Sequence, residues 1–243
     1  MQDSLAITRL LNQLFGGIVA SVMHAVGLPA NPATAINNTT ALEILVVAGL
    51  IAFFIVVRLS LSVEKPNAPQ QVAEMIHEFI GGQGEQIIGH GYERFQAFLT
   101  CIALFVLLNN LLGLVPGVVT PTSQPVVPLG LAVLTFLYYN YHGIRTQGPI
   151  GYIKHFAGPV WWMSWLILPI EVVSHLARVL SLTIRLYANM LASDLVTLVF
   201  FSLIPFAVPT IFLGLHFAVS IIQAFVFMLL TMIYLSLATA HDH

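Results

Sequence analysis

The sequence has 243 residues, of which 58% are hydrophobic and only 7% are charged, and its net charge is −2. A soluble domain normally has about a quarter charged residues, because water must solvate its exterior. These values exclude a water-soluble globular fold and a basic surface for nucleic acid, and they indicate that lipid is the main solvent. The sequence has only one cysteine, which excludes a disulfide framework and a two-cysteine metal motif.

The apolar segments predict an all-α, polytopic membrane domain with about five membrane helices. Residues 1–41 mix apolar and polar side chains without the pattern of a secretory signal, so we expect a mature extramembrane arm. Residues 42–63 and 95–115 are long and apolar enough to cross a core of about 30 Å. Residues 129–142 supply a third, shorter span.

A surface-lying amphipathic helix is predicted at residues 66–90. Glutamine and glutamate side chains alternate there with Val72, Ile76 and Phe79, which gives the helix one polar and one apolar face. The pair Gly81-Gly82 is predicted to end the helix.

Two long helices, at residues 161–204 and 206–240, complete the membrane domain. Proline ends or kinks helices, so Pro205 and Pro209 divide this long apolar tract. A helix over residues 166–203 would be ~55 Å long, nearly twice the thickness of the hydrocarbon core. We therefore expect a steeply tilted hairpin, and steep tilt is normally imposed by a packing partner.

The loop charges predict that the N-terminus lies outside and the C-terminus in the cytoplasm. Five crossings with this orientation place five basic residues on the inner side and only Arg9 on the outer side, as the positive-inside rule requires. The five inner basic residues are Arg58, Lys65, Arg94, Arg145 and Lys154.

Four charged residues lie within the two long helices, where each costs roughly 2.5 to 3.5 kcal/mol at mid-bilayer and is by default a functional candidate. They are Glu171, Arg178, Arg185 and Asp194. At about 100° per residue, all of them except Asp194 share one stripe with His175 and Asn189. A second polar stripe on the last helix comprises His216, Ser220, Gln223, Thr231 and Tyr234.

Folding the two helices about Pro205 predicts which side chains share a depth. Asp194 meets the level of His216 toward the outside. Arg185 lies near Gln223, and His175 near Tyr234, each within about one helical turn.

This arrangement indicates two proton paths separated by a fixed cation. Carboxylates and histidines pass protons along hydrated chains, whereas an arginine with a pKa above about 12 does not release its proton. Arg185 is therefore expected to act as an electrostatic barrier, and a carboxylate on a moving partner would carry the proton past it.

The residues that carry these features resemble subunit a of F-type rotary ATP synthases. The resemblance rests on Ser181-Leu-Thr-Ile-Arg185-Leu-Tyr-Ala-Asn189-Met, on the following Asp194, and on the stretch from His216 to Tyr234 with Gln223-Ala-Phe-Val-Phe. Asn110-Leu-Leu-Gly-Leu-Val-Pro116 and the region from Pro66 to Phe79 also match the family.

The resemblance implies a stator subunit beside a rotating ring of small two-helix subunits (subunit c), each with one membrane carboxylate, and beside the peripheral stalk subunit b. Arg185 matches the family's essential arginine. Asp194 and His216 match the outer half-channel, Gln223 the glutamine near the arginine, and Glu171 the inner half-channel. Asn189 and Ser181 match polar positions that flank the arginine.

The sequence departs from the family pattern at two places. Gln124, Val126 and Pro128 stand where a carboxylate, an asparagine and a threonine are usual. Asp194 stands where glutamate is more frequent, so its reach to His216 is one methylene shorter.

The expected function is proton conduction for ATP synthesis in a bacterial inner membrane, with no nucleotide chemistry, cofactor, metal or nucleic acid on this chain. His175, Ser181, Ser220 and Tyr234 are equally well explained as interhelical hydrogen-bonding residues. Arg178 is better explained as a side chain that extends to the inner interface. The alternatives are a secondary transporter, which should show a repeated half, and a redox subunit, which should bring paired axial histidines.

Overall fold

The computed structural model describes residues 5–25, 27, 29, 31–32, 34–62, 65–115, 118–148, 164–203 and 207–239. The predicted hinge at Pro205, the loop with Lys154, and residues 161–163 and 240 lie outside the described residues. The described residues form α-helices, two 3₁₀ turns and no strand, so the all-α class is confirmed. The helices are α1 Ala6–Ala25, α2 Asn38–Leu59, α3 Ala68–Ile87, α4 Glu93–Leu111, α5 Val126–Gln147, α7 Ser164–Leu203 and α8 Ala207–Thr239.

Five described helices are long and apolar enough to cross a membrane, which matches the expected number. They correspond to α1, α2, α4 with the 3₁₀ turn Leu112–Leu114 that follows it, α7 and α8. The set differs from the predicted one, because it includes α1 from the N-terminal arm and omits α5. The α5 helix is less apolar because it carries polar side chains such as Thr135, Tyr139 and Asn140.

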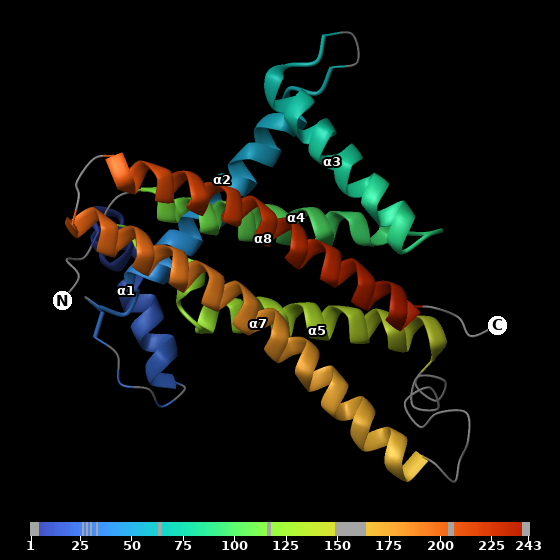
Figure 1. Ribbon diagram of the computed structural model, residues 1–243. Helices are drawn as coiled ribbons and strands as arrows, with labels where there is room; N and C mark the ends of the chain where they lie inside the picture. The colour runs from blue at the N-terminus through green and yellow to red at the C-terminus, as the bar shows by residue number, and fades with distance from the viewer. Residues whose placement is uncertain are drawn as a thin grey trace.

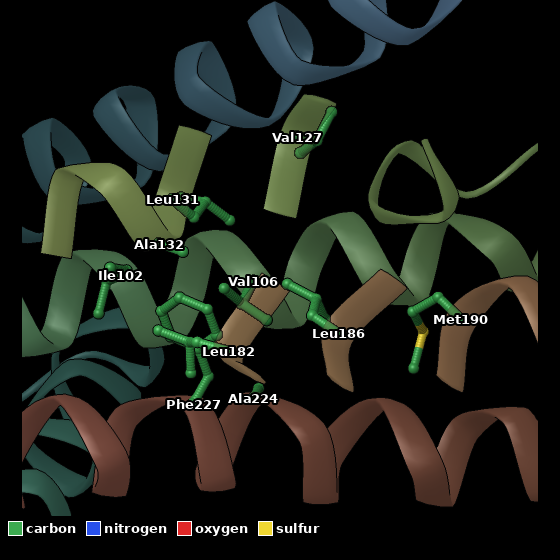
Figure 2. Packing of buried hydrophobic residues seen from close by; sticks show 10 residues of the cluster. All are labelled: Ile102, Val106, Val127, Leu131, Ala132, Leu182, Leu186, Met190, Ala224 and Phe227. Atoms are coloured by element: carbon green, nitrogen blue, oxygen red, sulfur yellow. The ribbon is translucent and has the colours of Figure 1, made fainter. Parts of the chain in front are cut away.

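Four helices, α4, α5, α7 and α8, pack side by side into one bundle (Figure 1). Their shared core contains buried side chains from every one of the four, and Figure 2 shows Val106, Leu182 and Phe227 gathered at its centre. The core also contains Ile102, Val127, Leu131, Ala132, Leu186, Met190 and Ala224. Because this core holds one face of α7 and one face of α8, the remaining faces of the hairpin point away from the bundle.

The two C-terminal helices are as long as the sequence predicts. The α7 helix has 40 residues and α8 has 33, which corresponds to lengths of ~60 Å and ~50 Å. Figure 1 shows them running antiparallel, with their joined ends at the left of the view. Helices of this length fit a bilayer only when they are strongly inclined.

The α2 helix crosses the bundle at an angle, and α1 and α3 lie near its opposite ends (Figure 1). It begins at Asn38, because the side chain of Asn37 caps it by accepting a hydrogen bond of 2.7 Å from the backbone N–H of Thr40. Arg58 lies in its last turn, where a cation interacts favourably with the helix dipole.

The α3 helix is amphipathic, as predicted, but the prediction that Gly81-Gly82 ends it is wrong. The helix continues to Ile87, and Gly81 and Gly84 face α4. A β-carbon on Gly81 would lie 2.9 Å from Gln96 Nε2, and one on Gly84 would lie 3.0 Å from a ring carbon of Tyr92. These glycines therefore allow close helix packing, while Val72, Met75 and Phe79 stay exposed on the other side.

Candidate functional site

Asp194 of α7 and His216 of α8 come together, as the equal-depth argument predicts. His216 Nδ1 lies 3.8 Å from Asp194 Oδ1. The imidazole is only 1% exposed, whereas the carboxylate side chain is 18% exposed. The pair thus joins one fully buried base to one partly accessible acid.

The tautomer of neutral His216 is determined by its neighbours. Nε2 lies 3.1 Å from the backbone carbonyl oxygen of Asn110, which can only accept, so Nε2 carries the hydrogen. Nδ1 is then the basic nitrogen, and it accepts from the hydroxyl of Ser193 at 2.7 Å. The ring consequently offers a single proton-binding atom, directed at Ser193 and Asp194.

Asp194 is also held by a segment that the sequence did not indicate. The hydroxyl of Thr120 donates to Oδ1 at 2.7 Å, and the backbone N–H of Thr120 donates to Oδ2 at 3.3 Å. Thr120 is fully buried beside the 3₁₀ turn Pro121–Ser123, while Gln124 is exposed. The loop before α5 therefore supplies polar contacts through Thr120, upstream of the positions where the family pattern is missing.

Gly113 leaves the space in which these groups meet. It lies in the 3₁₀ turn Leu112–Leu114, directly beside Thr120 and His216. A β-carbon at this position would overlap Thr120 Oγ1 and lie 2.7 Å from His216 Nε2. Any larger residue would therefore displace the threonine, the imidazole or both.

Nearer the middle of the hairpin, Asn189 donates a hydrogen bond of 2.8 Å to Gln223 Oε1. Gln223 thus lies within one helical turn of Arg185, which agrees with the predicted depth. Its hydrogen-bond partner, however, is Asn189 and not Arg185. Gln223 is buried, and its Nε2 has no hydrogen-bond partner among the described residues. This amide remains available for water.

A cavity of about 370 Å³ between α7 and α8 joins the two polar levels. Its walls include Ser193, which is bonded to His216, together with Asn189 and Gln223. The remaining walls are mostly apolar, and the polar groups at either end can anchor several water molecules.

Arg185 lies on the exposed face of α7, away from the bundle core. Its guanidinium makes no hydrogen bond or ion pair with any residue that the structure describes. Three exposed residues on this face are small, namely Ser181, Ala188 and Ala192, and Asn189 is exposed beside them. Because a cation beside lipid is costly, Arg185 is by default a functional candidate.

A second polar cluster surrounds the N-terminal half of α7. Glu171 Oε1 lies 3.4 Å from His175 Nε2, and His175 Nδ1 lies 2.7 Å from the hydroxyl of Tyr139 on α5. The Tyr139 ring also lies 5.9 Å from the Tyr234 ring, centroid to centroid. Tyr139 therefore stands between His175 and Tyr234, which the sequence placed at one depth.

Arg178 belongs to this cluster as well. Its guanidinium carbon lies 5.5 Å from the centroid of the Tyr234 ring, in a cation–π contact. The sequence did not predict this contact with α8, and the extension of Arg178 to the inner interface stays a prediction. Ser220, by contrast, only donates to the backbone carbonyl of His216 within its own helix.

Four contact residues were missed by sequence reasoning: Asn110, Thr120, Tyr139 and Ser193. Asn110 reaches the site through its backbone carbonyl, Thr120 from the loop before α5, and Tyr139 from α5. Ser193 lies next to Asp194 on α7 and reaches across to His216. The run Thr120-Pro-Thr-Ser in an otherwise apolar loop was the available signal for one of them.

Comparison with known proteins gives one consistent result. A sequence profile of the family described as ATP synthase A chain matches residues 40–236. The chain is 49% identical over 244 residues to ATP synthase subunit a of Koribacter versatilis, with both chains fully covered. It is 46% identical to that of Solibacter usitatus, over 85% of this chain and 88% of the relative.

We predict that Gly113→Ala disrupts the site around His216. The added methyl group should lower stability by roughly 1–3 kcal/mol through overpacking. It should also move the imidazole off the Asn110 carbonyl, which thermal unfolding and ¹⁵N NMR of the histidine would report.

The matched control is Gly214→Ala on α8, where a β-carbon meets nothing within 4 Å. A Gly113→Ala protein with unchanged stability and unchanged histidine shifts would contradict the steric assignment.

Proposed function

The chain belongs to the ATP synthase A chain family, whose members are the membrane subunit a, and we propose that it conducts protons through two offset half-channels to the ring carboxylates. As a member of this family it is an integral membrane subunit for ion transport and ATP synthesis. The half-channels, the role of Arg185 and the absence of nucleotide chemistry on this chain are the proposed part.

The observation that carries the proposal is the guanidinium of Arg185 on the outward face of α7, which has no partner among the residues that the structure describes. Small neighbours on that face allow another helix to approach closely, which is how helices pack in membranes. A ring helix that brings a carboxylate to Arg185 would supply the missing counter-charge. The carboxylate would ionise beside the arginine and be protonated elsewhere, since Arg185 does not release its own proton.

The outer half-channel in this proposal begins at Asp194 and His216. A proton binds at Nδ1 of His216, and the carboxylate at 3.8 Å stabilises the imidazolium. The Asn110 carbonyl keeps Nε2 protonated throughout. The proton therefore enters and leaves through one nitrogen, and the Ser193 hydroxyl and water in the adjoining cavity lead it toward Asn189 and Gln223.

The inner half-channel in this proposal runs along Glu171, His175 and Tyr139. The contacts of 3.4 Å and 2.7 Å form a continuous chain of groups able to exchange protons. Arg185 separates this chain from the outer one, because a fixed cation repels a migrating proton.

The proposed partners are the ring of small carboxylate-bearing subunits c, at the Arg185 face, and the peripheral stalk subunit b, on family grounds alone. The relatives are bacterial, which supports an inner-membrane location. We propose the orientation with the C-terminus in the cytoplasm from the distribution of basic loop residues.

Arg185→Ala should abolish proton-driven ATP synthesis, because the ring carboxylate would lose its counter-charge and the two paths would no longer be separated. Membrane vesicles energised by a respiratory substrate give the measurement, and immunoblotting checks assembly. Arg58→Ala, in the last turn of α2, is the control and should retain synthesis. Normal synthesis by Arg185→Ala would refute the central proposal.

His216→Ala should slow proton flux by roughly a hundredfold, the scale of a positioned proton-transfer group. Flux through the membrane sector, followed with a pH-sensitive dye after removal of the catalytic sector, measures it. The control is His90→Ala, which replaces an exposed histidine after α3. An unchanged flux would argue against the outer path.

A cysteine at Ala188 should cross-link to a ring subunit that carries a cysteine near its carboxylate, in a Cys101→Ser background. A cysteine at Leu180, exposed on another side of α7, is the control and should not cross-link. Failure of both cysteines to cross-link in the intact complex would favour the alternative, a self-contained transporter.

A further inference from the structure

The α1 helix, Ala6–Ala25, lies outside the residues that match the family profile. It has 20 residues and is apolar enough to cross a membrane by length and composition. A helix of this kind can either span the bilayer or lie along its surface, and its contacts in the fold distinguish the two.

One face of α1 is bonded to the chain that precedes α2. The backbone N–H of Leu5 and the hydroxyl of Thr8 both donate to Asn38 Oδ1, at 3.2 Å and 2.8 Å. The side chain of Asn12 binds both backbone groups of Ile36, each at 2.9 Å. At Gly16, a β-carbon would overlap the carbonyl oxygen of Pro32.

These contacts hold α1 beside the segment 32–38 for almost three helical turns. The described residues of the connection from Gly27 to Asn37 form no helix or strand. Irregular backbone exposed to lipid does not occur within the hydrocarbon core, because its polar groups would lack partners. Since this connection must stay at the water boundary, the helix bonded along it stays there too.

The opposite face of α1 is apolar and points away from the protein. Its exposed apolar side chains follow helical spacing, and they are Ile7, Leu10, Leu14, Phe15, Ile18 and Val22. Ser21 is also exposed there, and its hydroxyl donates to the backbone carbonyl of Gly17. Gln13, by contrast, is exposed on a different side of the helix. This division is typical of a helix that lies in the membrane interface with its apolar side against the acyl chains.

We infer that α1 is an interfacial anchor. Its apolar face is buried among the lipids at the membrane surface where α2 begins. Its occupant is lipid because α1 contacts α2, a candidate membrane span whose side chains Ile44 and Leu45, two turns after its start, are exposed. With α3 at the other end of α2 (Figure 1), two surface helices fix the depth of that crossing from both sides.

The test measures the depth of single nitroxide labels in the intact complex, reconstituted in phosphatidylcholine–phosphatidylglycerol vesicles. Cysteines replace Leu14, Ile18, Gln13 and Phe54 one at a time in a Cys101→Ser background. Collision rates with oxygen and with a water-soluble nickel chelate report the depth of each label. Leu14 and Ile18 should be equally shallow, Gln13 should be accessible to nickel, and Phe54 in α2 should be deep.

Two results would overturn the inference. A label at Leu14 as deep as the one at Phe54 would make α1 a spanning helix. A label at Leu14 that collides with the nickel chelate as often as the label at Gln13 would place the apolar face in water. As a second check, Leu14→Glu should reduce the oxygen collision rate of the label at Ile18, whereas Gln13→Glu should not. ATP synthesis should persist in both variants, so failure here leaves the proton-path proposal intact.

Discussion

The central physical constraint on this hairpin is a cation within a membrane helix that no described residue neutralises. Arg185 has no partner among the described residues and lies on the face of α7 that the bundle core leaves free. Lipid cannot compensate a guanidinium in the way that water does. In the proposed function a polar partner approaches this surface closely, beside small side chains on α7 and the hydrogen-bonded Asn189–Gln223 pair.

The same constraint explains why the other ionisable groups of the hairpin have partners. Asp194 receives two donors from Thr120, and His216 is bound on both ring nitrogens. His175 is bound by Glu171 and Tyr139. A buried polar group without a partner loses the free energy of hydration without replacement. These networks therefore stabilise the bundle, and in the proposed half-channels they would set the direction in which each group exchanges a proton.

Much of this arrangement follows from the sequence, because helical period and distance from the hinge are local quantities. They place Asp194 level with His216, and Gln223 within a turn of Arg185, before any contact is known. The composition likewise requires an all-helical membrane fold. The prediction that Gly81-Gly82 ends α3 is wrong, because Gly81 allows close packing against Gln96 and the helix continues past it.

What the sequence by itself determined is the solvent, the helical class and the depth of each charged residue along the hairpin. Only the tertiary structure decided which side chains from other segments meet them: Thr120 at Asp194, the Asn110 carbonyl at His216, Tyr139 at His175, and the segment before α2 along α1. The physical reason is that depth depends on rise per residue within one helix. Contact depends instead on how neighbouring helices rotate and how closely they pack, and therefore on residues such as Gly113 that carry no chemistry of their own.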